Sequence, residues 1–222
     1  NTGVAMGVAM DAGYKNFGDG QAAVEMMEEI ARGSEIGKIL GNGPLAVGKH
    51  FNHHRVPVVK GQSIAAYDPR GMQGNGVTYA TSPMGADHTA GNLIGSYLTG
   101  QLDPLETDGQ VEASRNAQIF MAYLDCTGLC LFAAGAMASP EGAQLLVNMI
   151  NIKCGTQLGT DEALGMGART LKAELEFNAN AGLSKEDDRL AQFFYEEPLP
   201  PHNKVFLVSD EALDSVHNSE PI

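Results

Sequence analysis

Apolar residues recur at helical spacing along most of the chain. In the segment 21–32 they fall on one face of a helix, with Asp19 placed to cap its start and Gly33 to end it. Apolar residues in the segment 108–124 never alternate strictly with polar ones, so we expect a helix there too. Similar start and stop signals predict further helices over residues 139–152, 160–182 and 184–194.

Strand signals are few by comparison. Short apolar runs occur at residues 56–59 and 205–208, and Pro57 restricts the first of them to the edge of a sheet. We therefore predict an all-α, multihelical fold with few or no short strands.

Two segments lack regular periodicity. Residues 67–87 combine two prolines with several glycines, and residues 195–203 contain three prolines. Long irregular segments are uncommon inside a compact domain unless they are functional. We expect the first to form a site and the second to wrap the surface. A connector at residues 101–108 predicts a boundary between two helical domains, 1–104 and 105–222.

Composition excludes several classes of protein. The chain has 222 residues, 43% of them hydrophobic, which is enough for a sizeable core. Its 14-residue apolar run at 126–139 is shorter than a bilayer-spanning helix, so no membrane span is expected. A net charge of −13 argues against nucleic acid as a partner. Three cysteines in apolar settings suit a reducing compartment, and the cytoplasm is the expected location.

The first candidate for chemistry is the segment Asp125–Cys130, with the sequence DCTGLC, at the predicted end of a helix. A carboxylate can accept two parallel N–H bonds from the amino-pyrimidinone edge of a pterin, and a thiol can bind iron. Without further context, a cysteine in such a place is more often a small core residue.

The second candidate lies within residues 67–88. It contains Asp68-Pro69-Arg70-Gly71, then Tyr79-Ala80-Thr81-Ser82, and ends at His88. Glycines let the backbone approach a flat ligand, and a histidine can transfer protons near neutral pH. The alternative is a glycine-rich turn with a structural histidine.

A third cluster comprises His50, His53 and His54, whose spacing is compatible with one helix face. Zinc is one interpretation of this cluster. The other is a basic helix end that complements the helix dipole.

Taken together, the first two motifs resemble the aldehyde:ferredoxin oxidoreductase family of tungsten enzymes. In that family a DPRG loop leads through a YATS-like stretch to a histidine, and a DxxGLC motif follows. The same order occurs here, from Asp68 through His88 to Cys130. The helical character of the rest resembles the family's C-terminal domains 2 and 3.

The resemblance implies a tungsten held by two pterin dithiolenes beside a [4Fe-4S] cluster. Asp125, Gly128 and Leu129 would contact one pterin, and Cys130 would ligate the cluster and stand between it and that pterin. His88 would lie near the tungsten, as a proton acceptor or as a donor to the substrate oxygen. The implied reaction converts a small aldehyde and water to a carboxylic acid, and two electrons pass through the cluster to ferredoxin.

Several features of the family are absent from the sequence. It has no DxxGLD motif, no other cluster cysteines and no β-rich N-terminal domain, so we expect the chain to begin just after that motif. The chain alone would be an incomplete enzyme that needs an N-terminal half or partner subunit, and a homodimer is one assembly that the resemblance allows. Met84 and Thr89 stand near His88 where family members carry basic residues. Two alternatives therefore stay open: an aromatic acyl-CoA reductase-like subunit, and a non-catalytic helical fragment that binds a partner subunit.

Overall fold

The structure is a computed structural model that describes residues 1–218. Its regular structure is almost entirely helical, and the one small antiparallel sheet within these residues pairs β1 (Val58–Val59) with β2 (Gln62–Ser63). The all-α prediction is confirmed. The helices are α1 (Thr2–Asp11), α2 (Gly20–Arg32), α3 (Glu35–Gly41), α4 (Pro44–Phe51), α5 (Gln73–Thr81), α6 (Ile94–Leu98), α7 (Gln110–Thr127), α8 (Pro140–Cys154), α9 (Thr160–Asn180), α10 (Phe193–Glu196) and α11 (Asp210–Ser215), with 3-10 helices η1 (His88–Ala90), η2 (Leu131–Ala138) and η3 (Lys185–Asp187).

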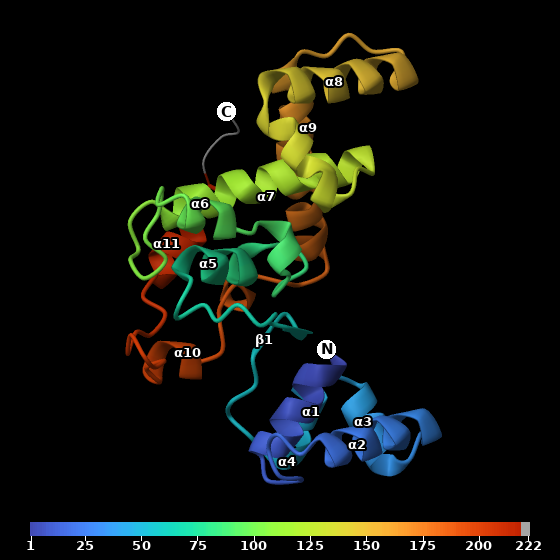
Figure 1. The fold of residues 1–222 in the computed structure, drawn as a ribbon, viewed down its shortest axis with the longest axis vertical. Coiled ribbons are helices and arrows are strands. Elements are labelled where there is room, and N and C mark those ends of the chain that lie inside the picture. The colour runs from blue at the N-terminus through green and yellow to red at the C-terminus, as the bar shows by residue number, and fades with distance from the viewer. Residues whose placement is uncertain (219–222) are drawn as a thin grey trace.

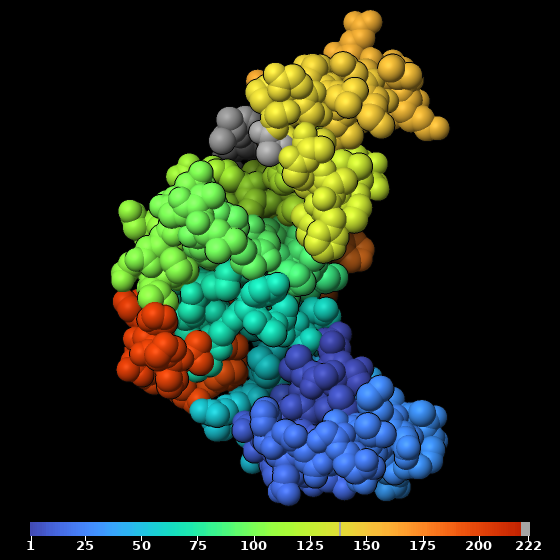
Figure 2. Space-filling view, viewed as in Figure 1, coloured from blue at the N-terminus to red at the C-terminus, as the bar shows by residue number. Residues whose placement is uncertain are grey.

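The molecule is elongated, as Figure 2 shows. Helices α1–α4 pack together at one end, and α8 lies at the other (Figure 1). Between them, α5 lies alongside α7, and α9 crosses α7 and extends toward α8. The middle of the molecule therefore brings together elements that lie far apart along the chain, from α5 to α11.

Helices with local start and stop signals form as predicted. The side chain of Asp19 accepts a hydrogen bond from the backbone N–H of Ala22 at 3.0 Å, and Gly33 ends α2 in the left-handed conformation. Ser139 caps α8 in the same way, through the backbone N–H of Gly142 at 3.1 Å. The helices predicted over 108–124 and 160–182 are α7 and α9.

The prediction that residues 67–87 are irregular is wrong, because α5 lies within them. All nine residues of α5 are buried. Its polar side chains find partners far away in sequence: Gln73 accepts a hydrogen bond from the Leu207 N–H at 2.8 Å, and the hydroxyls of Thr78 and Ser114 lie 2.7 Å apart. Tertiary contacts thus stabilise a helix for which the sequence has weak local propensity.

The strand expected at 205–208 is also absent. Gln73 occupies the backbone groups that a strand neighbour would use, since its amide donates to the Val205 carbonyl at 2.9 Å and accepts from Leu207. At residues 56–59, only Val58 and Val59 form a strand. Hydrogen bonds from the Gln73 side chain therefore take the place of the backbone hydrogen bonds of a β-sheet here.

The helix expected over 184–194 is limited to η3. Ser184 and Asp187 form the predicted capping box. The helix stops there because Asp188 turns inward to pair with Lys60 and Leu190 enters the core. A separate short helix, α10, begins only at Phe193.

The close packing of α9 on α7 depends on one glycine. A Cβ atom at Gly167 would lie 2.0 Å from the Ile119 carbonyl oxygen and 2.8 Å from the Tyr123 nitrogen. Any side chain at this position would therefore push the two helices apart.

The predicted domain boundary at 101–108 stays a prediction, and α5 and α7 pack together across it through Thr78 and Ser114.

Within residues 1–218, no single helix is long and apolar enough to cross a membrane. Helix α7 and the stretch Leu131–Met137 meet the length and composition criteria only as a pair, and the pair is bent by 107°.

Candidate functional site

The loop after α5 carries the predicted histidine. The hydroxyl of Ser82 donates to the Gly85 carbonyl at 2.9 Å, which tightens the turn. Asp87 then caps η1 by accepting from the Thr89 N–H at 2.9 Å. His88 is the first residue of η1, is half-buried, and its ring centroid lies 5.2 Å from that of Tyr67.

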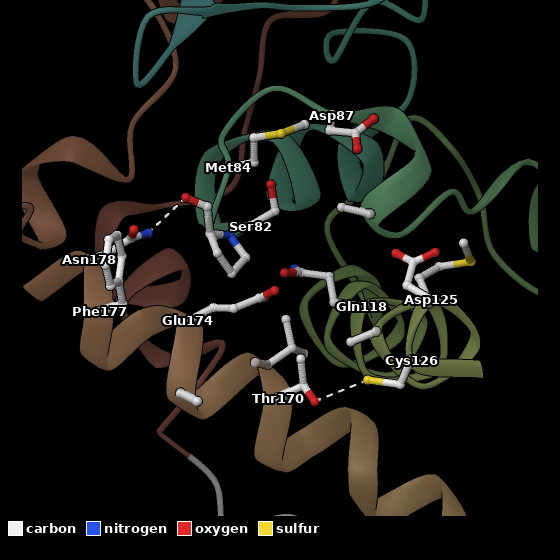
Figure 3. Close-up of a pocket in the computed structure, with 16 residues that line it drawn as sticks. Ser82, Met84, Asp87, Gln118, Asp125, Cys126, Thr170, Glu174, Phe177 and Asn178 are labelled. Atoms are coloured by element: carbon white, nitrogen blue, oxygen red, sulfur yellow. Dashed lines mark hydrogen bonds between the residues drawn. The ribbon is translucent and has the colours of Figure 1, made fainter. Parts of the chain in front are cut away.

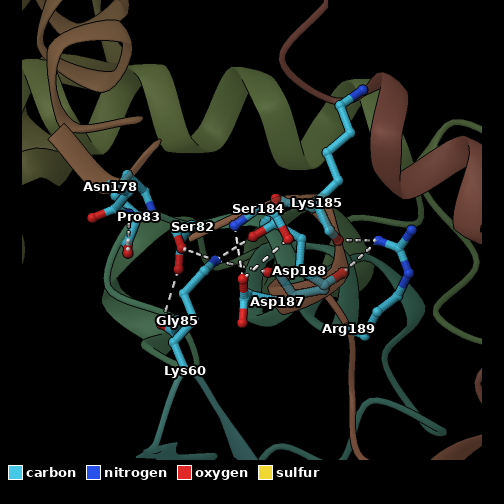
Figure 4. Close-up of polar contacts among 12 residues, drawn as sticks. Lys60, Ser82, Pro83, Gly85, Asn178, Ser184, Lys185, Asp187, Asp188 and Arg189 are labelled. Atoms are coloured by element: carbon cyan, nitrogen blue, oxygen red, sulfur yellow. Dashed lines mark hydrogen bonds and ion pairs between the residues drawn. The ribbon is translucent and has the colours of Figure 1, made fainter. Parts of the chain in front are cut away.

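A buried lysine holds this loop from below, as Figure 4 shows. The ammonium group of Lys60 donates to the carbonyl oxygens of Ala80 at 3.1 Å and Ser82 at 2.9 Å, and forms an ion pair with Asp188. The Lys60 side chain is only 6% exposed. Burial raises the pKa of the Asp188 carboxyl, although the charge and hydrogen bond of Lys60 act in the opposite direction. These contacts fix the backbone that leads to His88.

The second predicted segment lies where α7 ends. Gly128 takes the left-handed conformation at φ 71° and its N–H donates to the Asp125 carbonyl at 3.0 Å, so the chain turns sharply. The Leu129 side chain packs into a cluster that includes Leu146. Cys130 is exposed and carries a free thiol.

A groove of about 770 Å³ connects the two predicted segments. Its walls come from three elements, and Figure 3 shows side chains from all of them converging on one space. The loop contributes Ser82, Pro83, Met84, Asp87 and Ala90; α7 contributes Gln118, Met121, Ala122, Asp125 and Cys126; α9 contributes Thr170, Leu171, Ala173, Glu174, Phe177 and Asn178.

The groove unites some of the predicted site residues and not others. Asp125 lines it, opposite the loop that ends at His88. Neither His88 nor the residues of the turn from Gly128 to Cys130 belong to its walls. The structure thus brings Asp125 and the loop that leads to His88 together. The His88 imidazole and the Cys130 thiol lie outside this groove.

Gln118 and Glu174 are among the polar wall residues that were not anticipated from the sequence. Gln118 lies two helical turns before Asp125, and this seven-residue spacing, which places both on one face of α7, was available as a signal. Glu174 stands on α9, and no sequence pattern indicated it. Burial raises the pKa of the Glu174 carboxyl, and the negative charge of Asp125 raises it further.

The three histidines near α4 do not converge on a metal site. His53 pairs with Asp11 at 2.7 Å, and His54 pairs with Glu197 at 3.0 Å. Within residues 1–218, no group of three His, Cys, Asp or Glu side chains is arranged to hold a metal ion.

Comparisons with known proteins agree on one family. The family model for aldehyde ferredoxin oxidoreductase, domains 2 & 3, matches residues 1–218. The tungsten-containing aldehyde ferredoxin oxidoreductase of Pyrococcus horikoshii is 33% identical over 190 residues, which cover 83% of this chain and 31% of that protein. The enzymes of the same name from Pyrococcus furiosus and Thermococcus kodakarensis are 31% and 32% identical over 196 residues, which cover 86% of this chain and 32% of each protein. The chain thus spans about a third of the length of these relatives.

Proposed function

The chain belongs to the aldehyde ferredoxin oxidoreductase family, as domains 2 and 3, and on this premise we propose that it forms one side of a tungsten–pterin site that oxidises aldehydes to carboxylic acids. The observation that carries the proposal is the groove in which Asp125 faces the loop ending at His88. The family predicted from the two motifs is confirmed by these matches.

The groove suits a pterin in size and chemistry. Its volume of about 770 Å³ lies within the range of small-molecule and cofactor sites. Met84, Met121 and Phe177 supply apolar surface for flat rings. The Asp125 carboxylate is exposed and can accept two parallel N–H bonds from an amino-pyrimidinone edge. Gly128 would keep the Asp125 turn in place, and the Leu129 contact would come from its main chain, since its side chain is packed elsewhere.

Cys130 would provide one thiolate to a [4Fe-4S] cluster. Its thiol is exposed and free, as a cluster ligand requires, but one cysteine cannot hold a cluster. The other thiolates would come from a segment or subunit outside this chain. Free thiols at all three cysteines also support our proposal of a cytoplasmic location. Electrons would leave through this cluster to ferredoxin.

His88 would transfer protons during the reaction. Oxidation of an aldehyde with water releases two protons and two electrons, and when bound, the tungsten and its dithiolenes would supply the two-electron chemistry. A half-buried imidazole on a loop held by Lys60 would accept a proton or donate to the substrate oxygen. Low-potential reduction of an aromatic acyl-CoA is the alternative for the same site.

A further part of the proposal concerns the rest of the enzyme. Three apolar side chains follow one another at helical spacing on α8 and are exposed: Leu145, Met149 and Ile152, the last at 85%. Phe132 on η2 is 97% exposed. Such a stripe is typical of a surface that another chain or segment covers. We propose that the segment with the remaining cysteines, either an N-terminal half or a partner subunit, packs here.

Metal analysis of the complete protein, purified without oxygen, tests the proposal. We expect tungsten, a low-temperature EPR signal of a reduced [4Fe-4S] cluster, and viologen reduction that depends on added aldehyde. Reduction of an aromatic acyl-CoA without aldehyde oxidation would favour the alternative chemistry. A protein with no pterin, made in a host that supplies tungsten and pterin, would contradict both.

A further inference from the structure

Gln118 presents a buried hydrogen-bond acceptor to the groove. Its side chain is 1% exposed, and its Nε2 donates to the hydroxyls of Thr81 at 3.0 Å and Ser114 at 3.2 Å. Within residues 1–218, its Oε1 has no hydrogen-bond partner. Figure 3 shows the amide directed into the space between α7 and α9. Buried amide oxygens are rarely left without a donor, so this one is available to a donor from a ligand in the groove.

The hydrogen bonds around Gln118 fix which end of its amide faces the groove. Thr81 gives its hydroxyl hydrogen to the Val77 carbonyl at 2.8 Å. Thr78 gives its own to a backbone carbonyl at 2.8 Å, so Ser114 must donate to Thr78 at 2.7 Å. Both hydroxyl oxygens that face Gln118 are therefore acceptors, and only the NH2 end of the amide can bind them. The oxygen is left to point into the groove.

The groove holds other acceptors as well. Asp125 and Glu174 add two carboxyl groups to its walls, whereas Asp87 already accepts from Thr89. A ligand that binds to these groups together with Gln118 must carry several hydrogen-bond donors. An aldehyde or a carboxylic acid cannot do this, whereas a reduced pterin carries N–H groups both on its pyrimidinone edge and on its middle ring.

The spacing of Gln118 and Asp125 suits one ligand. Seven residues along an α-helix bring two side chains to the same face, about 10 Å apart along the axis. One carboxylate accepts two parallel N–H bonds at most from the pyrimidinone edge, so further N–H groups of a fused-ring pterin need other acceptors.

We propose that Gln118 is a further pterin-binding residue, whose Oε1 accepts a hydrogen bond from an N–H group of the pterin held by Asp125. This inference rests on the proposed function. It adds a residue that lies outside the DxxGLC motif and that links the pterin, through Thr81, to the loop of His88.

The test measures pterin retention in the complete, cofactor-loaded protein. Samples are taken during dialysis, and the pterin that the protein still holds is released, oxidised to its fluorescent form and expressed as moles per mole of folded protein. We expect Gln118→Leu to lose pterin about tenfold faster than the unaltered protein, because the acceptor is gone.

Gln110→Leu is the matched control. Gln110 is another fully buried glutamine of α7, but both ends of its amide are satisfied, by Tyr97 at 2.9 Å and the Asp103 carbonyl at 2.7 Å. It should lose helix stability without faster loss of pterin. If Gln118→Leu does not accumulate, Gln118→Asn, which draws the oxygen back by about one C–C bond of 1.5 Å, is measured by the same criteria.

The outcomes separate the two proposals. Equal pterin retention by the unaltered protein and Gln118→Leu would overturn the role of Gln118 and leave the pterin site intact, with water as the partner of Oε1. Equal losses from Gln118→Leu and Gln110→Leu would overturn it too, since helix damage would then be the cause. An unaltered protein without any pterin would overturn the proposed function itself.

Discussion

The side-chain amide of Gln118 donates to the hydroxyl of Thr81 at 3.0 Å, and this buried contact joins the two halves of the candidate site. Thr81 is the last residue of α5, directly before the loop that ends at His88. Gln118 lies on α7, on the same face as Asp125. The histidine loop and the Asp125 helix are thus positioned relative to each other by hydrogen bonds that lie beneath the groove.

Replacing His88 by alanine should lower turnover by about 10² or more in the complete enzyme, because a positioned proton-transfer group typically contributes that much. Metal and pterin content should stay unchanged. Steady-state aldehyde oxidation, measured beside tungsten content, checks this. His54→Ala, which removes an exposed histidine that pairs with Glu197 outside the groove, is the control. Turnover equal to that control would exclude the proton role of His88.

Cys130→Ser should damage the iron–sulfur cluster, since a hydroxyl is a much poorer iron ligand than a thiolate. We expect loss of at least half of the [4Fe-4S] EPR signal per protein. Cys154→Ser removes another exposed free thiol, at the end of α8, and should leave the signal unchanged. A Cys130→Ser protein with the spectrum of the unaltered enzyme would show that Cys130 is not a ligand.

Gly167→Ala should destabilise the protein by about 1–3 kcal/mol, because the added methyl group meets the backbone of α7. Urea unfolding gives the free energy. Gly165 is the control on the same helix: its Cβ would meet only the end of the Arg169 side chain at 3.3 Å, so alanine there should be neutral or slightly stabilising. Equal effects at both positions would mean that α7 and α9 do not pack as described.

The stability of the protein should fall as the pH drops below about 6.5, through His217. Its Nε2 lies 3.1 Å from the Thr81 carbonyl oxygen, and burial lowers its pKa below the unfolded value of 6.5, although Asp188 acts in the opposite direction. Between the folded pKa and pH 6.5 the unfolded chain binds more protons, so the free energy of unfolding decreases with acidification, by at most about 1.4 kcal/mol per pH unit.

His217→Gln should flatten this part of the stability curve, as measured by urea unfolding between pH 5 and 7. The buried Asp188 contributes with the opposite sign, since its raised pKa disfavours the charged form as the pH rises from its unfolded value of 3.8. His202→Gln, at an exposed histidine, should keep the slope of the unaltered protein. An unchanged slope in His217→Gln would exclude His217 as the titrating group.

Sequence patterns predicted what depends on neighbours along the chain. The α2 helix was found because its cap, Asp19, and its stop, Gly33, are adjacent to it. Helix α5 was missed because the partner that satisfies Gln73 is Leu207, which is distant in sequence. In the same way, the motif identified Asp125, whereas the unpartnered oxygen of Gln118 and the burial of Glu174 exist only once α7, α9 and the loop are assembled.

The polar contacts of α5 also determine when the site can form during synthesis of the chain. A nine-residue helix with two glycines is not stable alone, and α5 needs the backbone of Val205 and Leu207 to bind Gln73. Lys60 likewise lacks its carboxylate partner until Asp188 has been made. The loop of His88 therefore reaches its final position only after residues 188–207 have left the ribosome, so a cofactor that needs this loop binds after that segment has been made.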